Sequence, residues 1–179
     1  MPPIYLIMGS PAAGKSTVSR ALMRRFPSGL HVPVDNVRFM VVSGLADMGP
    51  GPSEALTLQL RLAHIAAARM AQTYAQAGFA VALDDFWFGD APDADYTRIL
   101  GSGLHRVILR PSRLAALERL AGRAPESFSF KQLLAQAIAM VDEALELHPK
   151  TGWHVVDSSH LTVEQTVDAL LKVTQTAPA

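Results

Sequence analysis

Short apolar runs alternate with longer amphipathic segments along the chain, and this alternation predicts the fold. A short unbroken apolar run is typical of a parallel strand that is covered on both faces. Residues 4–8 form such a run, and further short strands, some containing His or Arg, are predicted at 31–34, 79–83, 105–109 and 153–156. Helices are predicted between them at about residues 15–25, 54–77, 112–120, 129–147 and from 162 onward. The segments 44–53 and 90–95 are predicted as loops, because the first is rich in Gly and Pro and the second is acidic and contains Pro.

Polar residues at the ends of these segments support the predicted helices. Ser53 and Ser112 stand where an N-cap is needed. Capping boxes, in which a Ser or Thr is followed three residues later by Gln, are predicted for Ser129 with Gln132 and for Thr162 with Gln165. Strands separated by helices predict an α/β fold of three layers, with a five-stranded parallel sheet in the middle. The length of 179 residues favours one domain over residues 1–179.

Composition and charge narrow the classes of protein that fit this pattern. The chain is 49% hydrophobic and has 16 basic and 16 acidic residues, so its formal net charge is zero. A dedicated nucleic-acid binder usually carries a basic excess, which is missing from this total. The chain has no cysteine, which excludes disulfides and thiolate chemistry. The first apolar run has no basic region before it, and no apolar stretch is long enough to span a membrane. We therefore expect a cytoplasmic protein that does not enter the membrane.

Residues 9–17, Gly-Ser-Pro-Ala-Ala-Gly-Lys-Ser-Thr, fit the pattern G-x-x-x-x-G-K-[ST] of a P-loop. Glycines let the backbone turn so that its N–H groups point at phosphate oxygens, and the N-terminus of the next helix adds positive partial charge. Lys15 is expected to reach the β- and γ-phosphates of ATP, Ser16 to ligate Mg²⁺, and Thr17 to lie nearer the α-phosphate. A chance Gly-rich turn is the alternative, and the strand before the motif and the helix after it argue against it. The predicted nucleotide-binding residues are Gly9, Ser10, Ala12, Ala13, Gly14, Lys15, Ser16 and Thr17.

An acidic residue follows the second predicted strand, at Asp35 in Asp-Asn-Val-Arg. Ligands of open parallel sheets sit beyond the carboxyl ends of the strands, so Asp35 is expected in the cleft. A carboxylate there can accept the proton of a hydroxyl that attacks the γ-phosphate. Arg38, three residues on, is expected to hold the substrate or the transferred phosphoryl group. The structural alternative is that Asp35 only caps the next helix.

Further charged residues follow the third and fourth predicted strands. Asp84 and Asp85 are candidate magnesium ligands, and since neighbouring strand residues point to opposite faces, Asp84 is favoured. Asp85 is the second choice or belongs to the acceptor pocket, and the alternative for the aspartate that is not used is a cap of the following loop. Arg119 and Arg123 lie on one helical face and are expected to close over ATP, the alternative being solvated surface arginines. At least one of the aromatics at 86–88 is expected to line the acceptor pocket unless all pack in the core. The six histidines show no ligand-like spacing and are assigned no metal.

These motifs resemble those of small P-loop kinases, the class that includes shikimate, gluconate and adenylate kinases. The stretches Val81-Ala-Leu-Asp-Asp-Phe-Trp-Phe-Gly89 and Pro33-Val-Asp35 are similar to those of chloramphenicol phosphotransferase-like proteins, which are AAA-type ATP-binding proteins. The Asp35/Arg38 pair is equally similar to polynucleotide 5′-hydroxyl kinases. The resemblance implies strand order 2-3-1-4-5, Asp35 as the base, a lid at about residues 119–130 and a small-molecule hydroxyl acceptor. The other two readings are a nucleic-acid-processing kinase and an NTPase or regulator without an acceptor.

Overall fold

The computed structural model describes residues 1–48, 53–86, 91–122, 128–147 and 151–176. Strands and helices alternate along these residues as the sequence predicts, and most predicted boundaries are within a few residues of the observed ones. The elements in chain order are β1 (Ile4–Gly9), α1 (Lys15–Met23), β2 (Gly29–Pro33), α2 (Val34–Arg38), α3 (Glu54–Gln76), β3 (Ala80–Phe86), α4 (Ala91–Leu100), β4 (Leu104–Leu109), α5 (Arg113–Ala121), α6 (Phe128–Leu147), β5 (His154–Val156) and α7 (Val163–Thr174).

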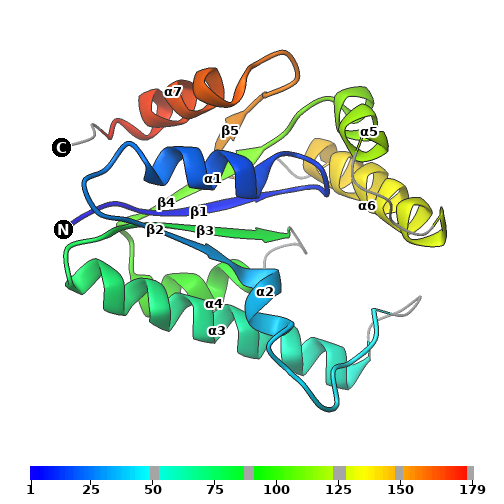
Figure 1. The fold of residues 1–179 in the computed structure, drawn as a ribbon, viewed down its shortest axis with the longest axis horizontal. Helices are drawn as coiled ribbons and strands as arrows, with labels where there is room; N and C mark the ends of the chain where they lie inside the picture. Colours follow the sequence, from blue (N-terminus) through cyan, green and yellow to red (C-terminus); the bar gives the residue numbers. More distant parts are fainter. Residues whose placement is uncertain (49–52, 87–90, 123–127, 148–150, 177–179) are drawn as a thin grey trace.

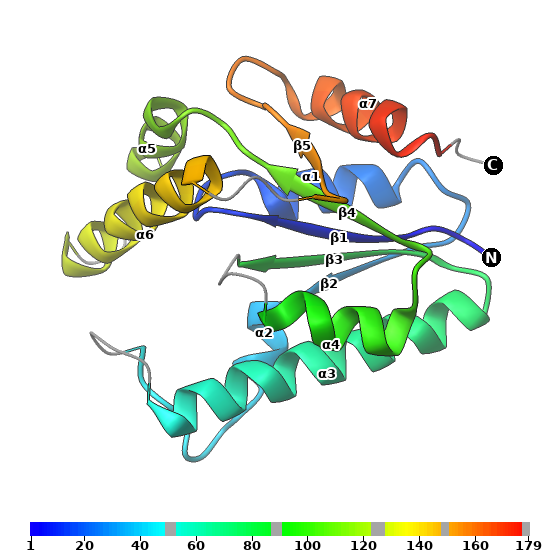
Figure 2. The same ribbon diagram turned by 180° about the vertical axis from the view of Figure 1, so that it is seen from behind.

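All strand pairs in the sheet are parallel, and the strands lie in the order β2-β3-β1-β4-β5, which confirms the predicted order. The helices α1 and α7 cover one face, whereas α3 and α4 cover the other (Figures 1 and 2). The helices α5 and α6 lie beyond the end of the sheet toward which the strand arrowheads point. The carboxyl ends of the strands, where an open α/β sheet binds ligands, therefore face this end of the molecule.

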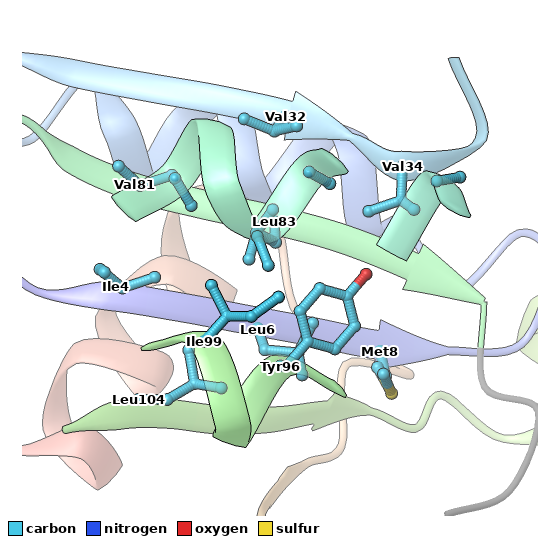
Figure 3. Close-up of a cluster of buried hydrophobic side chains, with 14 of the residues drawn as sticks. Ile4, Leu6, Met8, Val32, Val34, Val81, Leu83, Tyr96, Ile99 and Leu104 are labelled. Atoms are coloured by element: carbon cyan, nitrogen blue, oxygen red, sulfur yellow. The ribbon is translucent and has the colours of Figure 1, made fainter. Parts of the chain in front are cut away.

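The core has two sides because successive strand side chains point to opposite faces of the sheet. The residues Leu6, Met8 and Leu83 face α3 and α4, and they pack with Tyr96 and Ile99 of α4 (Figure 3). On the other face, a second buried cluster consists of β-strand residues together with residues of α1 and α7. It includes Tyr5, Ile7, Ala82, Val18, Leu22, Val167 and Leu170. β1 is buried along its whole length, as expected for a central parallel strand.

Two expectations for the helices are wrong. The acidic segment 90–95 was expected as a loop, but α4 begins at Ala91, and the Pro that suggested a loop stands in the first turn, where no N–H is needed. Ser129 was expected to cap α6, but the helix begins at Phe128, so Ser129 lies inside it. The other capping box is present, because the Thr162 hydroxyl accepts from Gln165 N and the Gln165 side chain accepts from Thr162 N.

Candidate functional site

The turn between β1 and α1 has the backbone shape that the P-loop pattern predicts. Gly9 has a φ of +154°, and a Cβ there would lie 2.4 Å from the carbonyl oxygen of Leu109 on the neighbouring strand. Ala12 and Gly14 have φ of 59° and 94°, in the left-handed region. Residues of alternating hand turn successive N–H groups toward one side and so form an anion-binding concavity.

The N-terminus of α1 has no side-chain cap. Gly14 occupies the N-cap position, and the first turn contains no acidic residue. The helices α3, α5 and α7, by contrast, are capped by the hydroxyl groups of Ser53, Ser112 and Thr162. The first-turn N–H groups and the helix dipole both favour a negative group. The end of α1 therefore fits a phosphate, whose oxygens would take the place of a side-chain cap.

Lys15, the first residue of α1, folds back over the turn. Its Nζ donates to the carbonyl oxygens of Gly9 at 3.1 Å and Ser10 at 3.0 Å, and it lies 6.0 Å from the centroid of the Phe86 ring. Positive charge is thus held beside the concavity. Ser16, the next residue, is exposed, so its hydroxyl is accessible to a ligand.

Asp35 lies in the first turn of α2, beside the phosphate loop. Pro33 is the N-cap residue of this helix and no side chain caps it, so the alternative role of Asp35 as a cap is excluded. The residue is exposed, yet surrounding protein atoms displace water from its carboxylate, and this raises its pKa above the ordinary value of 3.8. The charge of Lys15 acts in the opposite direction, that of Asp84 raises the pKa further, and that of Arg38 lowers it.

Arg38 ends the same helix and is 5% exposed. Its guanidinium group donates to the carbonyl oxygen of Ala46 and lies 5.4 Å from the centroid of the Phe39 ring. Its Nε atom is buried and has no hydrogen-bond partner in the described part of the chain. Arg38 therefore holds the segment after α2 in place, and its expected contact with a substrate or phosphoryl group stays a prediction.

The two aspartates lie inside β3, rather than after it, and point to opposite faces of the sheet. Asp84 alternates with Ala82 on the face that packs against α1, whereas Asp85 alternates with Leu83 on the face that packs against α3 and α4. Oδ2 of Asp84 lies 2.5 Å from Nε2 of His31 on β2. Asp84 therefore lies on the same face of the sheet as α1, the helix that follows the phosphate loop.

Asp85 belongs to a buried polar cluster with Tyr96 and His64. Its Oδ2 accepts from the Tyr96 hydroxyl at 2.8 Å and lies 3.3 Å from Nε2 of His64, and its Oδ1 accepts from Phe86 N at 2.8 Å. Burial raises the pKa of Asp85 to about 7 and lowers the pKa of His64 to about 4. Burial, together with the nearby charge of Asp85, also raises the pKa of Tyr96. Because each group is pushed toward its neutral form, the His64–Asp85 contact is not an ion pair near neutral pH.

Arg119 lines a pocket of about 380 Å³ between the phosphate loop, α5 and the segment that joins β5 to α7. Its guanidinium group donates to the carbonyl oxygen of Ser158 at 2.5 Å and to that of Ala13 at 3.4 Å. The pocket is also lined by Leu161 and Val163, so one wall is apolar. Arg123, Trp87 and Phe88 lie outside the described residues.

The oxygen atoms near the phosphate loop are suitable ligands for Mg²⁺. This ion prefers oxygen ligands, keeps several of its waters, and is commonly held by one or two carboxylates together with substrate phosphates. Ser16 offers a hydroxyl and Asp84 a carboxylate. Oδ1 of Asp84 has no hydrogen-bond partner among the described residues. No group of three His, Cys, Asp or Glu residues in the described ranges could hold a metal by itself. The residues therefore fit an ion that arrives with a nucleotide.

Three residues around the aspartates were missed in the sequence. His31, His64 and Tyr96 come from β2, α3 and α4, and only tertiary structure brings them to the end of β3. Neither histidine has a spacing to another ligand type that would single it out. A buried position in an Ala-rich helix was the only sign for His64, and it is equally typical of the core.

The fold and the loop are those of a P-loop nucleotide-binding protein. The model of the AAA domain family matches residues 4–148, and the chain belongs to this family. No curated protein matches the sequence. Within the described residues, no helix is both long and apolar enough to cross a membrane.

Solved structures of kinases share this fold at low sequence identity. A sugar kinase from Janibacter sp. HTCC2649 superposes with a TM-score of 0.71 at 15% identity, covering 99% of this chain and 97% of the other. A shikimate kinase from Bacteroides thetaiotaomicron gives 0.67 at 17% identity, covering 97% and 98%. A gluconokinase from Sinorhizobium meliloti 1021 gives 0.67 at 15% identity, covering 97% and 94%. At sequence identities this low, structural similarity shows a shared fold but does not identify the acceptor of this protein.

Proposed function

We propose that the protein transfers the γ-phosphate of ATP to a hydroxyl group of a small molecule, in the manner of chloramphenicol phosphotransferase-like proteins. The observation that carries the proposal is the position of Asp35. Its carboxylate is close enough to Lys15 and Asp84 for their charges to act on its pKa, so a base candidate lies beside the phosphate loop. A protein that only binds a nucleotide, without attack on its γ-phosphate, has no need of such a base.

In the proposed reaction, the backbone N–H groups of the loop bind the phosphates, and Lys15 exchanges its loop carbonyls for the β- and γ-phosphate oxygens. Asp35 accepts the proton of the acceptor hydroxyl as its oxygen forms a bond to the γ-phosphorus, and the bond from that phosphorus to the β–γ bridging oxygen breaks to release ADP. Ser16 and Asp84 would hold Mg²⁺, which neutralises charge on the phosphates. A raised pKa makes Asp35 a stronger base than an ordinary aspartate.

The pocket beside Arg119 is the proposed site of the base of ATP. It adjoins the phosphate loop through Gly14 and Thr17, and Leu161 and Val163 give it an apolar wall for a planar ring. The proposed lid spans about residues 119–130, and Arg119 stands at its start, where a guanidinium group can move toward the phosphates. An enzyme that consumes ATP works where ATP is plentiful, which supports a cytoplasmic location.

The acceptor is proposed to bind next to α2 and the segment that follows it. The side chain of Gln59 on α3 holds this segment, because it donates to Gly44 O at 2.7 Å and accepts from Ala46 N at 2.9 Å. Phe39 and Met40, directly after the helix of Asp35, are 60% and 68% exposed. Exposed apolar side chains beside a catalytic base support an acceptor with an apolar body, as in chloramphenicol.

Labelled ATP tests the proposal in a transfer screen against antibiotics, sugars, nucleosides and 5′-hydroxyl oligonucleotides. We expect transfer to a small molecule, loss of about 10²–10⁴ in kcat for Asp35→Ala with ATP affinity retained, and loss of both affinity and turnover for Lys15→Ala. Transfer by Asp35→Ala at the wild-type rate would remove the base assignment. Phosphorylation of the oligonucleotides alone would favour the nucleic-acid kinase, which the zero net charge disfavours.

A further inference from the structure

A histidine contacts each aspartate at the end of β3, and the two histidines, His31 partly buried and His64 buried, lie on opposite faces of the sheet. His31 of β2 contacts Asp84 through Nε2 and Oδ2 at 2.5 Å, on the face of α1. His64 of α3 contacts Asp85 through Nε2 and Oδ2 at 3.3 Å, on the face of α3 and α4. The side chains of His31 and Asp84 are only 10% and 8% exposed, so water competes little for their hydrogen bond.

The sheet itself fixes this contact. In the pairing of β2 with β3, His31 stands opposite Ala82 and Pro33 stands opposite Asp84. His31 therefore reaches Asp84 diagonally across one strand boundary, on the same face of the sheet, within the range of a long side chain. An ionised carboxylate only accepts hydrogen bonds, so we take Nε2 of His31 as the donor to Asp84.

The two aspartates differ in how many of their carboxylate oxygens already accept a hydrogen bond. Both oxygens of Asp85 accept hydrogen bonds, Oδ1 from Phe86 N and Oδ2 from Tyr96. Asp84 uses Oδ2 for His31, while its Oδ1 has no hydrogen-bond partner among the described residues. A carboxylate with one oxygen fixed by a protein donor presents the other in a defined direction.

We propose that His31 is a positioning residue for Asp84. Its hydrogen bond would hold the carboxylate so that Oδ1 faces a water of the Mg²⁺ that accompanies the nucleotide. The proposal rests on the proposed function, because it concerns the ion that function requires. In this proposal Asp84 is the aspartate that helps to bind Mg²⁺, whereas Asp85 joins β3 to α3 and α4. His31 touches neither the nucleotide nor the reacting atoms in this scheme.

The test compares His31→Leu with His31→Gln by titration calorimetry of ADP, once with Mg²⁺ and once with EDTA. Leu and Gln have similar volumes, but only Gln keeps an N–H near the position of Nε2. The ratio of the two ADP affinities measures how well the site uses the ion. We expect His31→Leu to lose about tenfold in this ratio, the lower end of the effect of removing a group that orients a metal ligand, and His31→Gln to retain most of it. ADP affinity in EDTA should stay at the wild-type value in both variants.

His64→Leu is the matched control, because it removes the same kind of contact from the aspartate on the other face. We expect it to keep the wild-type ratio. An unchanged ratio in His31→Leu, an equal loss in His64→Leu, or a wild-type protein that binds ADP equally with and without Mg²⁺ would each overturn the role of His31 and leave the nucleotide site standing. If His31→Leu shows no cooperative thermal transition, His31→Phe, which keeps an aromatic ring without the N–H, replaces it. A wild-type protein that binds no ADP overturns the proposed function and this inference with it.

Discussion

Replacing Asp85 with Asn is expected to remove a large part of the pH dependence of stability between about pH 5 and about pH 8. The carboxyl group is buried at 3% exposure, and burial raises its pKa from 3.8 to about 7. Below pH 3.8 the folded and unfolded chains both carry the proton. As the pH rises, the unfolded chain loses it first, so the free energy of unfolding falls until the pH has passed about 7.

The size of the effect follows from the gap between the two pKa values. At about 1.36 kcal/mol per pKa unit, the whole gap corresponds to about 4 kcal/mol, of which about 2.5 kcal/mol is lost between about pH 5 and about pH 8. For a chain of this length that is about 5–10 °C in Tm. Asparagine does not titrate in this range, and its amide oxygen can still accept from the Tyr96 hydroxyl. The free energy of unfolding of the variant should therefore lack the fall with pH that Asp85 causes.

Urea unfolding of wild type and Asp85→Asn at matched pH values measures the effect, since the other titrating groups cancel in the difference between the two proteins. That difference should grow in favour of the variant as the pH rises. A difference that stays constant to within about 0.5 kcal/mol would refute a raised pKa at this position. Tyr96→Phe is the companion variant. It keeps the carboxyl but removes a donor that lowers the pKa, so the fall in stability should move to higher pH.

Three further substitutions test the loop, the pocket and the last helix. Gly9→Ala places a Cβ 2.4 Å from Leu109 O, so it should weaken ADP binding at least about tenfold by calorimetry, whereas Gly103→Ala, which meets nothing within 4 Å, should leave binding unchanged. Arg119→Ala removes a charged donor from the pocket and should weaken ADP about tenfold, and unaltered affinity would separate the pocket from the nucleotide. Thr162→Ala should lower the free energy of unfolding by about 1 kcal/mol in urea titrations, and a neutral result would mean that water replaces the cap.

The central part of the sheet could be predicted from the sequence because β1, β3 and most of β4 are short, largely apolar runs that are buried. Chain order and the right-handed crossover rule then leave few possible arrangements, and the resemblance selected the observed one. The errors came where local signals have two meanings. An acidic segment with Pro is typical of a loop, but the same residues suit the first turn of a helix, as in α4. A Ser followed by Gln three residues later is a capping box only if the helix begins between them, which Ser129 shows.

The site divides in the same way. The phosphate loop is contiguous in sequence, so its residues could be named in advance, and strand alternation placed Asp84 and Asp85 on different faces before the structure did. The partners of these aspartates could not be found, because they come from three separate elements. Nothing in the spacing of His31, His64 or Tyr96 indicates that they meet at one strand end. Such contacts depend on register and helix packing, which single-sequence patterns do not specify.

The uncapped N-terminus of α1 makes the stability of the protein depend on how much of its phosphate-containing ligand is present. No side chain caps this end of the helix, so a bound phosphate would offer acceptors to its first-turn amides. A ligand at ~100 times its Kd adds about 2.7 kcal/mol to the free energy of unfolding. Protein loaded with the proposed nucleotide should therefore resist unfolding, and proteolysis of the unfolded chain, better than protein freed of ligand by dialysis.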